Sequence, residues 1–155
     1  RVAGTVSTTV AEEQTVIEYF EDAPLRPRPP LDEYLLFRPR ASEPVVDVVH
    51  HPRIHNSFGS IQGGAVVILM ERAAAHLGAL TTGDASRAVS ADVHYLSQAK
   101  GGPFEARAEL LSRHGDHVTA RVRIFDVGND DRLLSVGTVV TTSMDLDGTD
   151  LKGER

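Results

Sequence analysis

The stretch HNSFGSIQGGAVVILMERAAAHLGAL, residues 55–80, predicts the element around which the rest of the chain is organised. From residue 64 to 80 it is rich in alanine and apolar on nearly every side, which is typical of a helix buried inside a protein. Its one carboxylate, Glu71, has only apolar residues three and four positions away in either direction. Burying a carboxylate is costly unless it is paired, protonated or next to water, so Glu71 is a candidate functional residue.

Four segments after the turn TTGDAS alternate apolar and polar residues, as half-buried strands do. They cover residues 89–95, 104–110, 118–124 and 134–142. The connections SRHGD and VGNDD offer glycine, asparagine and aspartate for tight turns, so we expect an antiparallel meander with one apolar face. The predicted helix is the only long apolar element that can cover this face. The sequence therefore predicts the α+β class.

The residues before the helix are harder to assign. Residues 8–20 have a capping box and apolar residues on one face, which predicts a short helix, and a proline-rich linker follows. EYLLF and VVDVV are short β-prone runs. We expect an N-terminal helix and linker over 1–30, one domain over 31–144, and a flexible tail over 145–155.

Composition excludes several classes of function. The net charge is −6 and no lysine or arginine cluster is present, so we expect no nucleic-acid partner. No apolar run approaches the roughly 20 residues that span a bilayer, so we expect no membrane partner. The absence of cysteine excludes a thiolate nucleophile or a zinc-thiolate site and fits a cytoplasmic location.

Histidine and serine side chains are candidates for metal binding and for nucleophilic catalysis. His50, His51 and His55 invite a metal assignment, but neighbouring strand residues point to opposite faces and no acidic ligand is near in sequence. We therefore predict no metal site. His76 is expected to be an exposed or interfacial helix residue. The chain has no Gly-x-Ser-x-Gly motif, which argues against a serine hydrolase of the α/β type.

Three features of the quoted stretch carry a family resemblance: Asn56, the pair Gly63-Gly64, and Glu71 near the middle of the helix. This pattern resembles the acyl-CoA thioesterases of the phenylacetate-degradation type, in which an acidic residue follows a His-Gly-Gly histidine by nine positions. Gln62 stands in place of that histidine. VSADVHYLSQAKGG, residues 89–102, is similar to the family's Tyr-Leu-x-Pro-Ala segment, with glutamine at the proline position. The resemblance covers roughly residues 44–142.

This resemblance implies a hotdog fold, an antiparallel sheet wrapped around one long central helix, and hydrolysis of acyl-CoA without metal or cofactor. The Gly63 or Gly64 amide, helped by Gln62, would polarise the thioester carbonyl. Gln62 can donate a hydrogen bond but cannot carry a proton. Glu71 would activate water or attack directly to form an anhydride. Asn56 would hold the water or the carbonyl.

The substrate-binding predictions concern residues farther along the chain. Ser90 could bond the carboxylate or the water across a dimer interface. Lys100, Arg113 and His114 lie in or beside turns and could meet the phosphates of CoA, although a solvated surface charge is the more common role for each. The resemblance also implies a homodimer or a dimer of dimers with sites at the interface.

Each assignment has a structural alternative. The glycine pair could only permit a tight turn, and Asn56 could form an Asx turn. Glu71 could be a structural ion-pair partner of His94 or of an arginine from a neighbouring subunit. At the level of function, the alternative to an enzyme is a non-catalytic module that binds acyl-CoA or lipid in the same cavity. A hotdog hydratase has no support because no Asp-x-x-x-x-His run occurs.

Overall fold

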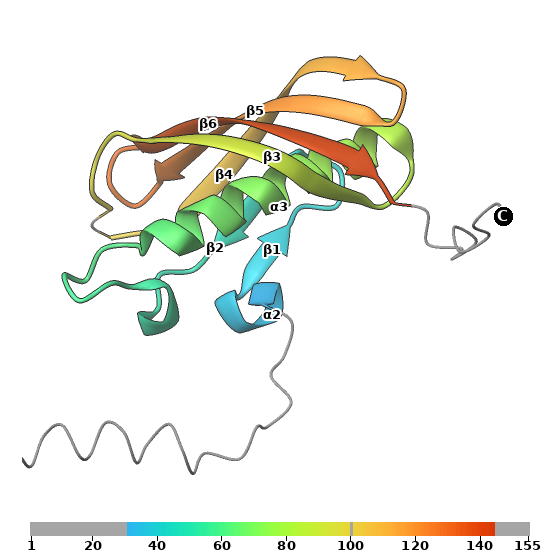
Figure 1. Ribbon diagram of the computed structural model, residues 1–155. Coiled ribbons are helices and arrows are strands. Elements are labelled where there is room, and N and C mark those ends of the chain that lie inside the picture. The colour runs from blue at the N-terminus through green and yellow to red at the C-terminus, as the bar shows by residue number, and fades with distance from the viewer. Residues whose placement is uncertain (1–30, 100, 145–155) are drawn as a thin grey trace, which may run out of the picture.

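The computed structural model describes residues 31–99 and 101–144, which form one antiparallel sheet against one long helix (Figure 1). The helices are α2 (Leu31–Leu35), the short 3-10 helix η1 (Pro52–Ile54) and α3 (Gly63–Thr82). The strands are β1 (Phe37–Pro39), β2 (Val45–Val48), β3 (Ser86–Tyr95), β4 (Phe104–His114), β5 (His117–Asp126) and β6 (Arg132–Ser143). The α+β hotdog prediction is confirmed, whereas the predicted structure of residues 1–30 and 145–155 lies outside the described residues.

The order of the strands differs from the expected meander. Strands β4, β5 and β6 are joined by short turns and pair in succession, as predicted. Strand β3 instead pairs with β6, and β4 pairs with β2, so that the sheet order is β1-β2-β4-β5-β6-β3. The physical reason is the connection over residues 96–103, which is too long for a tight hairpin. It runs from β3, at one edge of the sheet, past β6 and β5 to β4.

Helix α3 packs on the concave side of this sheet and supplies much of the core (Figure 1). Gly78 packs tightly against the sheet, because a Cβ there would lie 2.5 Å from the Ser86 hydroxyl on β3 and 2.8 Å from the Thr141 hydroxyl on β6. The helix ends at Gly83, whose left-handed backbone lets its N–H donate to the Ala79 carbonyl. The helix residues buried against the sheet are Ala65, Val66, Leu69, Met70, Ala73, Ala74, Leu77 and Gly78.

The length of α3 corrects one expectation. The prediction that no apolar run approaches membrane-spanning length is wrong, because the 20 residues of this helix are long and apolar enough by composition alone. Glu71 and Arg72 are too few charges to lower its apolar character. Core helices of the same composition are common, and this one lies against the sheet along its buried face.

Two local predictions are also corrected. The β-prone run EYLLF is divided between α2 and β1, with Leu36 in a left-handed turn between them. Helix α2 is stabilised by residues that follow it in the sequence. His51 bonds the Leu35 carbonyl, and the Arg53 guanidinium lies over the Tyr34 ring. In β3, a bulge between residues 88 and 90 interrupts the predicted alternation.

Candidate active site

The first turn of α3 leaves its backbone N–H groups available. Gln62 occupies the N-cap position with an extended backbone, but its side chain makes no capping hydrogen bond. No acidic residue lies in the first turn. Because a helix N-terminus carries unpaired donors and a partial positive charge, Gly63 and Gly64 present a site for a negatively polarised oxygen.

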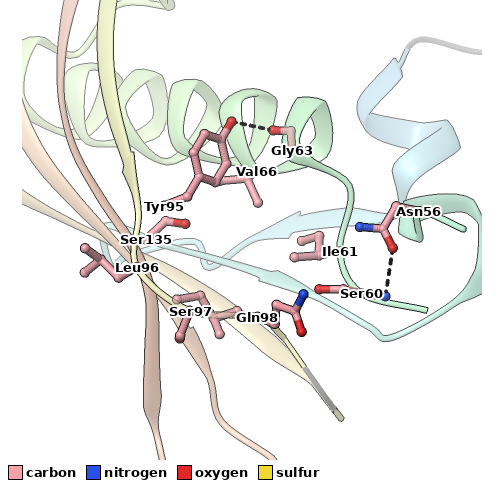
Figure 2. Close-up of a pocket in the computed structure, with 11 residues that line it drawn as sticks. Asn56, Ser60, Ile61, Gly63, Val66, Tyr95, Leu96, Ser97, Gln98 and Ser135 are labelled. Atoms are coloured by element: carbon pink, nitrogen blue, oxygen red, sulfur yellow. Dashed lines mark hydrogen bonds between the residues drawn. The ribbon is translucent and has the colours of Figure 1, made fainter. Parts of the chain in front are cut away.

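A cavity of about 380 Å³, here called the Gly63 cavity, opens at this helix end (Figure 2). Three segments form it: the loop before α3, the first turn of α3, and the crossing connection after β3 with the facing part of β6. The crossing connection that alters the strand order therefore also builds the cavity. Its lining residues are Asn56, Ser60, Ile61, Gly63, Val66, Tyr95, Leu96, Ser97, Gln98, Leu134 and Ser135.

Tyr95 lies over the helix start. Its hydroxyl donates to the Gly63 carbonyl at 3.0 Å, and its side of β3 is open, since 57% of the residue is exposed. A Cβ on Gly63 would lie 3.4 Å from the Tyr95 hydroxyl, whereas a Cβ on Gly64 would meet nothing within 4 Å. Tyr95 therefore packs against Gly63, and Gly64 leaves free space in front of the helix N-terminus.

Asn56 is fixed by its own turn. Its Oδ1 accepts from the backbone N–H of Phe58 at 2.9 Å and of Ser60 at 3.1 Å. This is the Asx-type geometry foreseen as the structural alternative. The amide nitrogen makes no hydrogen bond to the described residues, and Figure 2 shows it on the side of Ile61, which lines the cavity. One half of the side chain thus holds the loop while the other half can donate to a ligand.

Glu71 lies in a second cavity of about 450 Å³, here called the Glu71 cavity. It is half-buried, and within residues 31–99 and 101–144 no group donates a hydrogen bond to its carboxylate. Eight residues separate Glu71 from Gly63, which is about 12 Å along the helix axis. A single chain therefore does not bring the carboxylate to the Gly63 amide. The cavity is lined by Leu31, Ile68, Glu71, Arg72, Ala75, Ser86, Arg87, Ala88 and Met144.

The geometry does not place His94 beside Glu71. His94 instead pairs with Asp92 at 3.2 Å, and both side chains are largely exposed. After the bulge, Ser90 shares the alternation of these two residues, while Tyr95 and Val93 contact the helix side. Ser90 therefore lies on the outer face of the sheet and lines neither cavity.

The residues predicted to meet CoA phosphates are not gathered at the Gly63 cavity of the same chain. Arg113 donates to the Thr81 carbonyl at 2.8 Å, which is about 27 Å along α3 from Gly63. His114 is exposed at the end of β4, opposite His117. Lys100 lies outside the described residues. Arg113 acts here as a partner for the carbonyl end of the helix.

The histidines before α3 form a packed group. The rings of His50 and His55 lie 4.1 Å apart, and the Nε2 atom of His55 is buried without a hydrogen-bond partner. Burial, together with the nearby His50 and His51, lowers the pKa of His55. In the described residues no group of three histidine, aspartate or glutamate side chains is placed to hold a metal ion. His76 is half-buried rather than exposed, because its Nε2 bonds the carbonyls of Arg40 and Glu43.

Two cavity residues were missed from the sequence. Tyr95 belongs to the segment that carries the resemblance, but its place over the helix start depends on the tertiary structure. Ser135 alternates with Gly137, Val139 and Thr141 on the buried side of β6, a mixed pattern that gives no signal for a site residue in the sequence.

Comparison with known proteins gives one family match over part of the chain. Residues 58–132 match the model of the thioesterase superfamily. This range begins in the Asx turn and covers α3, the crossing connection and the sheet through the start of β6. It therefore contains most of the residues lining both cavities. No curated protein is a significant sequence match to the chain.

Solved structures share the fold at low sequence identity. The BH2602 protein of Bacillus halodurans, solved with CoA, is 14% identical, with a TM-score of 0.65 over 74% of this chain and 75% of that one. The thioesterase HI1161 of Haemophilus influenzae is 18% identical, with a TM-score of 0.66 over 75% and 83%. AziG of S. sahachiroi is 19% identical, with a TM-score of 0.66 over 76% and 98%. These similarities show a common fold.

Proposed function

We propose that this protein hydrolyses an acyl-CoA thioester to the free acid and CoA, as a thioesterase of the phenylacetate-degradation type. The observation that carries the proposal is the uncapped N-terminus of α3, which opens into a cavity large enough for an acyl thioester. The thioesterase-superfamily match over residues 58–132 and a CoA-bound structural neighbour support it.

In the proposed reaction, the thioester oxygen is held by the backbone N–H groups of Gly63 and Gly64. A water molecule attacks the carbonyl carbon while Glu71 accepts its proton, and the amides stabilise the oxyanion. The carbon–sulfur bond then breaks, and the proton passes from Glu71 to the thiolate of CoA. The free amide nitrogen of Asn56 can orient the water or the carbonyl. One such oxyanion donor is worth roughly 10²–10³ in rate.

Glu71 must come from a second copy for this reaction to work. Strand β3 lies at the sheet edge, and in the described chain its outer side has no pairing strand. The Glu71 cavity adjoins its first residues and the Gly63 cavity its last. If two β3 strands pair antiparallel about a two-fold axis, the Gly63 cavity of one chain meets the Glu71 cavity of the other. Exposed Val89 and Tyr95 on this strand would be covered.

The test combines assembly, activity and one substitution. We expect a native mass of at least twice 16.8 kDa and thiol release from acyl-CoA. Glu71→Gln should reduce kcat by about 10²-fold or more, the scale of lost general-base catalysis. Its Tm should stay close to that of the wild type, because no described residue depends on the charge. CoA-ester binding, measured by calorimetry, should persist.

Three results would contradict the proposal in different ways. A monomer at micromolar concentration would remove the shared site. A Glu71→Gln protein that melts far below the wild type but keeps its kcat would make Glu71 a structural ion-pair partner, whose loss costs on the order of 3–5 kcal/mol. Binding of acyl-CoA without any thiol release would favour the non-catalytic module.

A further inference from the structure

Ser135 is a polar residue in an apolar place. It lies on the helix side of β6, opposite buried Ile124 on β5 and opposite Tyr95 on β3. Only 2% of the residue is exposed. The side of β6 that carries Ser135 also carries Gly137, Val139 and Thr141, and it faces the core.

The hydroxyl of Ser135 makes no hydrogen bond to any described residue, yet it lines the Gly63 cavity. Figure 2 shows its oxygen directed into the space between β6 and the first turn of α3. The enclosed side-chain atoms without a partner in the described residues are His55 Nε2 and Ser143 Oγ, so the Ser135 hydroxyl is open to the cavity rather than sealed in the core. Water or a ligand atom in the cavity can therefore bond to it.

Ser97 provides a contrast within the same cavity. Its hydroxyl also belongs to a lining residue, but it donates to the Leu133 carbonyl at 2.7 Å. That hydroxyl is already used by the fold. Ser135 is thus distinguished from Ser97 by an unused hydrogen-bonding group rather than by residue type.

The position of Ser135 relative to the helix indicates which part of a substrate it would meet. Tyr95 lies directly across from Ser135 and reaches the Gly63 carbonyl with the end of its side chain. Ser135 therefore lies about one tyrosine side chain from the helix N-terminus, where the proposed function places the thioester. The walls between them include apolar Val66 and Leu134. A ligand in this space needs hydrocarbon next to the thioester and a polar atom farther out.

We propose that Ser135 is a specificity-determining residue that binds an oxygen atom on the distal part of the acyl group. This inference rests on the proposed function. The substrate class is then an acyl-CoA whose chain carries a hydroxyl or carbonyl oxygen several carbons from the thioester, rather than a plain hydrocarbon chain. A serine hydroxyl can donate to either oxygen and accept from the hydroxyl.

The experiment compares matched substrates on the full-length chain: hexanoyl-CoA, 6-hydroxyhexanoyl-CoA and 5-oxohexanoyl-CoA. For the wild type we expect kcat/KM about tenfold higher for at least one oxygenated substrate, as one hydrogen bond can supply. Ser135→Ala should bring this ratio close to one, mainly by raising KM for the oxygenated substrate. Ser97→Ala is the matched control and should leave the ratio unchanged.

The outcomes separate this inference from the proposed function. Thiol release with no preference for oxygen, or a preference that survives Ser135→Ala, would overturn the role of Ser135 and leave hydrolysis standing; Ser135 would then bond only water. If no ester releases thiol, calorimetry is used to compare the binding of the same three ligands to the wild type and to Ser135→Ala. A preference for oxygenated ligands that is lost in Ser135→Ala would support the inference without hydrolysis, and equal or absent binding would overturn it.

Discussion

Replacing Gly64 with alanine should make the protein more stable and less active. Gly64 is in the first turn of α3 without a left-handed backbone, and a Cβ there would meet nothing within 4 Å. Alanine therefore fits without strain and restricts the unfolded chain, which stabilises the protein by about 0.4–1 kcal/mol. For a chain of this size, 1 kcal/mol raises Tm by about 2–4 °C. Thermal melts and urea unfolding measure this gain.

The same methyl group should obstruct the proposed oxyanion site. In a helix the Cα–Cβ bond is tilted toward the N-terminus, so the added methyl lies in front of the exposed amides. We expect kcat/KM for acyl-CoA to fall by about 10²-fold, the lower end of the effect of losing one donor. Gly63→Ala is the companion variant: its Cβ would lie in ordinary contact with the Tyr95 hydroxyl at 3.4 Å, so it should fit as well and also lose activity.

A Gly64→Ala protein that is more stable and fully active would refute the reasoning, because free space at the helix start would then have no role in the reaction. A protein that is clearly destabilised would show instead that the backbone itself requires glycine.

Two further predictions concern stability. Arg113→Ala should lower the free energy of unfolding by about 0.5–1 kcal/mol, through loss of the bond to the Thr81 carbonyl at the helix C-terminus, and should leave KM for acyl-CoA unchanged; a KM that rises for acyl-CoA but not for an acyl-pantetheine thioester would restore its role at the phosphates. His55, whose pKa is lowered by burial and by His50 and His51, should make stability fall as pH drops below about 6.5, because the unfolded chain binds the proton first. The free energy of unfolding, measured in urea from pH 7.5 to 5, should decline more steeply for the wild type than for His55→Gln, by at most about 1.4 kcal/mol per pH unit, and equal slopes would contradict this.

Local patterns predicted most of the elements but not how they connect. Helix α3 was expected over 64–80 and spans Gly63–Thr82, because a long apolar run has one stable solution in a small domain. The place of β3 beside β6 depends on a crossing connection that has no periodic signal. Helix α2 was missed because its carbonyl end is stabilised by His51, a contact from outside the segment.

The candidate site shows the same division. Asn56, Gln62 and Gly63 are close in sequence, and the structure places them near one helix end, so a short motif is enough to predict that they lie together. Ser135 reaches the same cavity from β6 and required the sheet order. Glu71 shares the motif's sequence but not its cavity, because a helix separates residues eight positions apart by about 12 Å.

The uncapped helix and the unpaired carboxylate are best understood together. A serine, threonine or aspartate at the N-cap of α3 would stabilise the helix by about 0.5–2 kcal/mol, yet the chain places Gln62 and two glycines there. Asn56, which could cap a helix, holds its own loop instead. Glu71 has no donor in the described chain and lies too far along α3 to neutralise the helix start. The N-terminus of α3 carries a partial positive charge and Glu71 a negative one. Antiparallel pairing of two β3 strands would bring the helix start of one chain close to the Glu71 of the other. The stability that one chain lacks at the N-cap of α3 and at Glu71 would then be recovered when the second chain and the thioester bind.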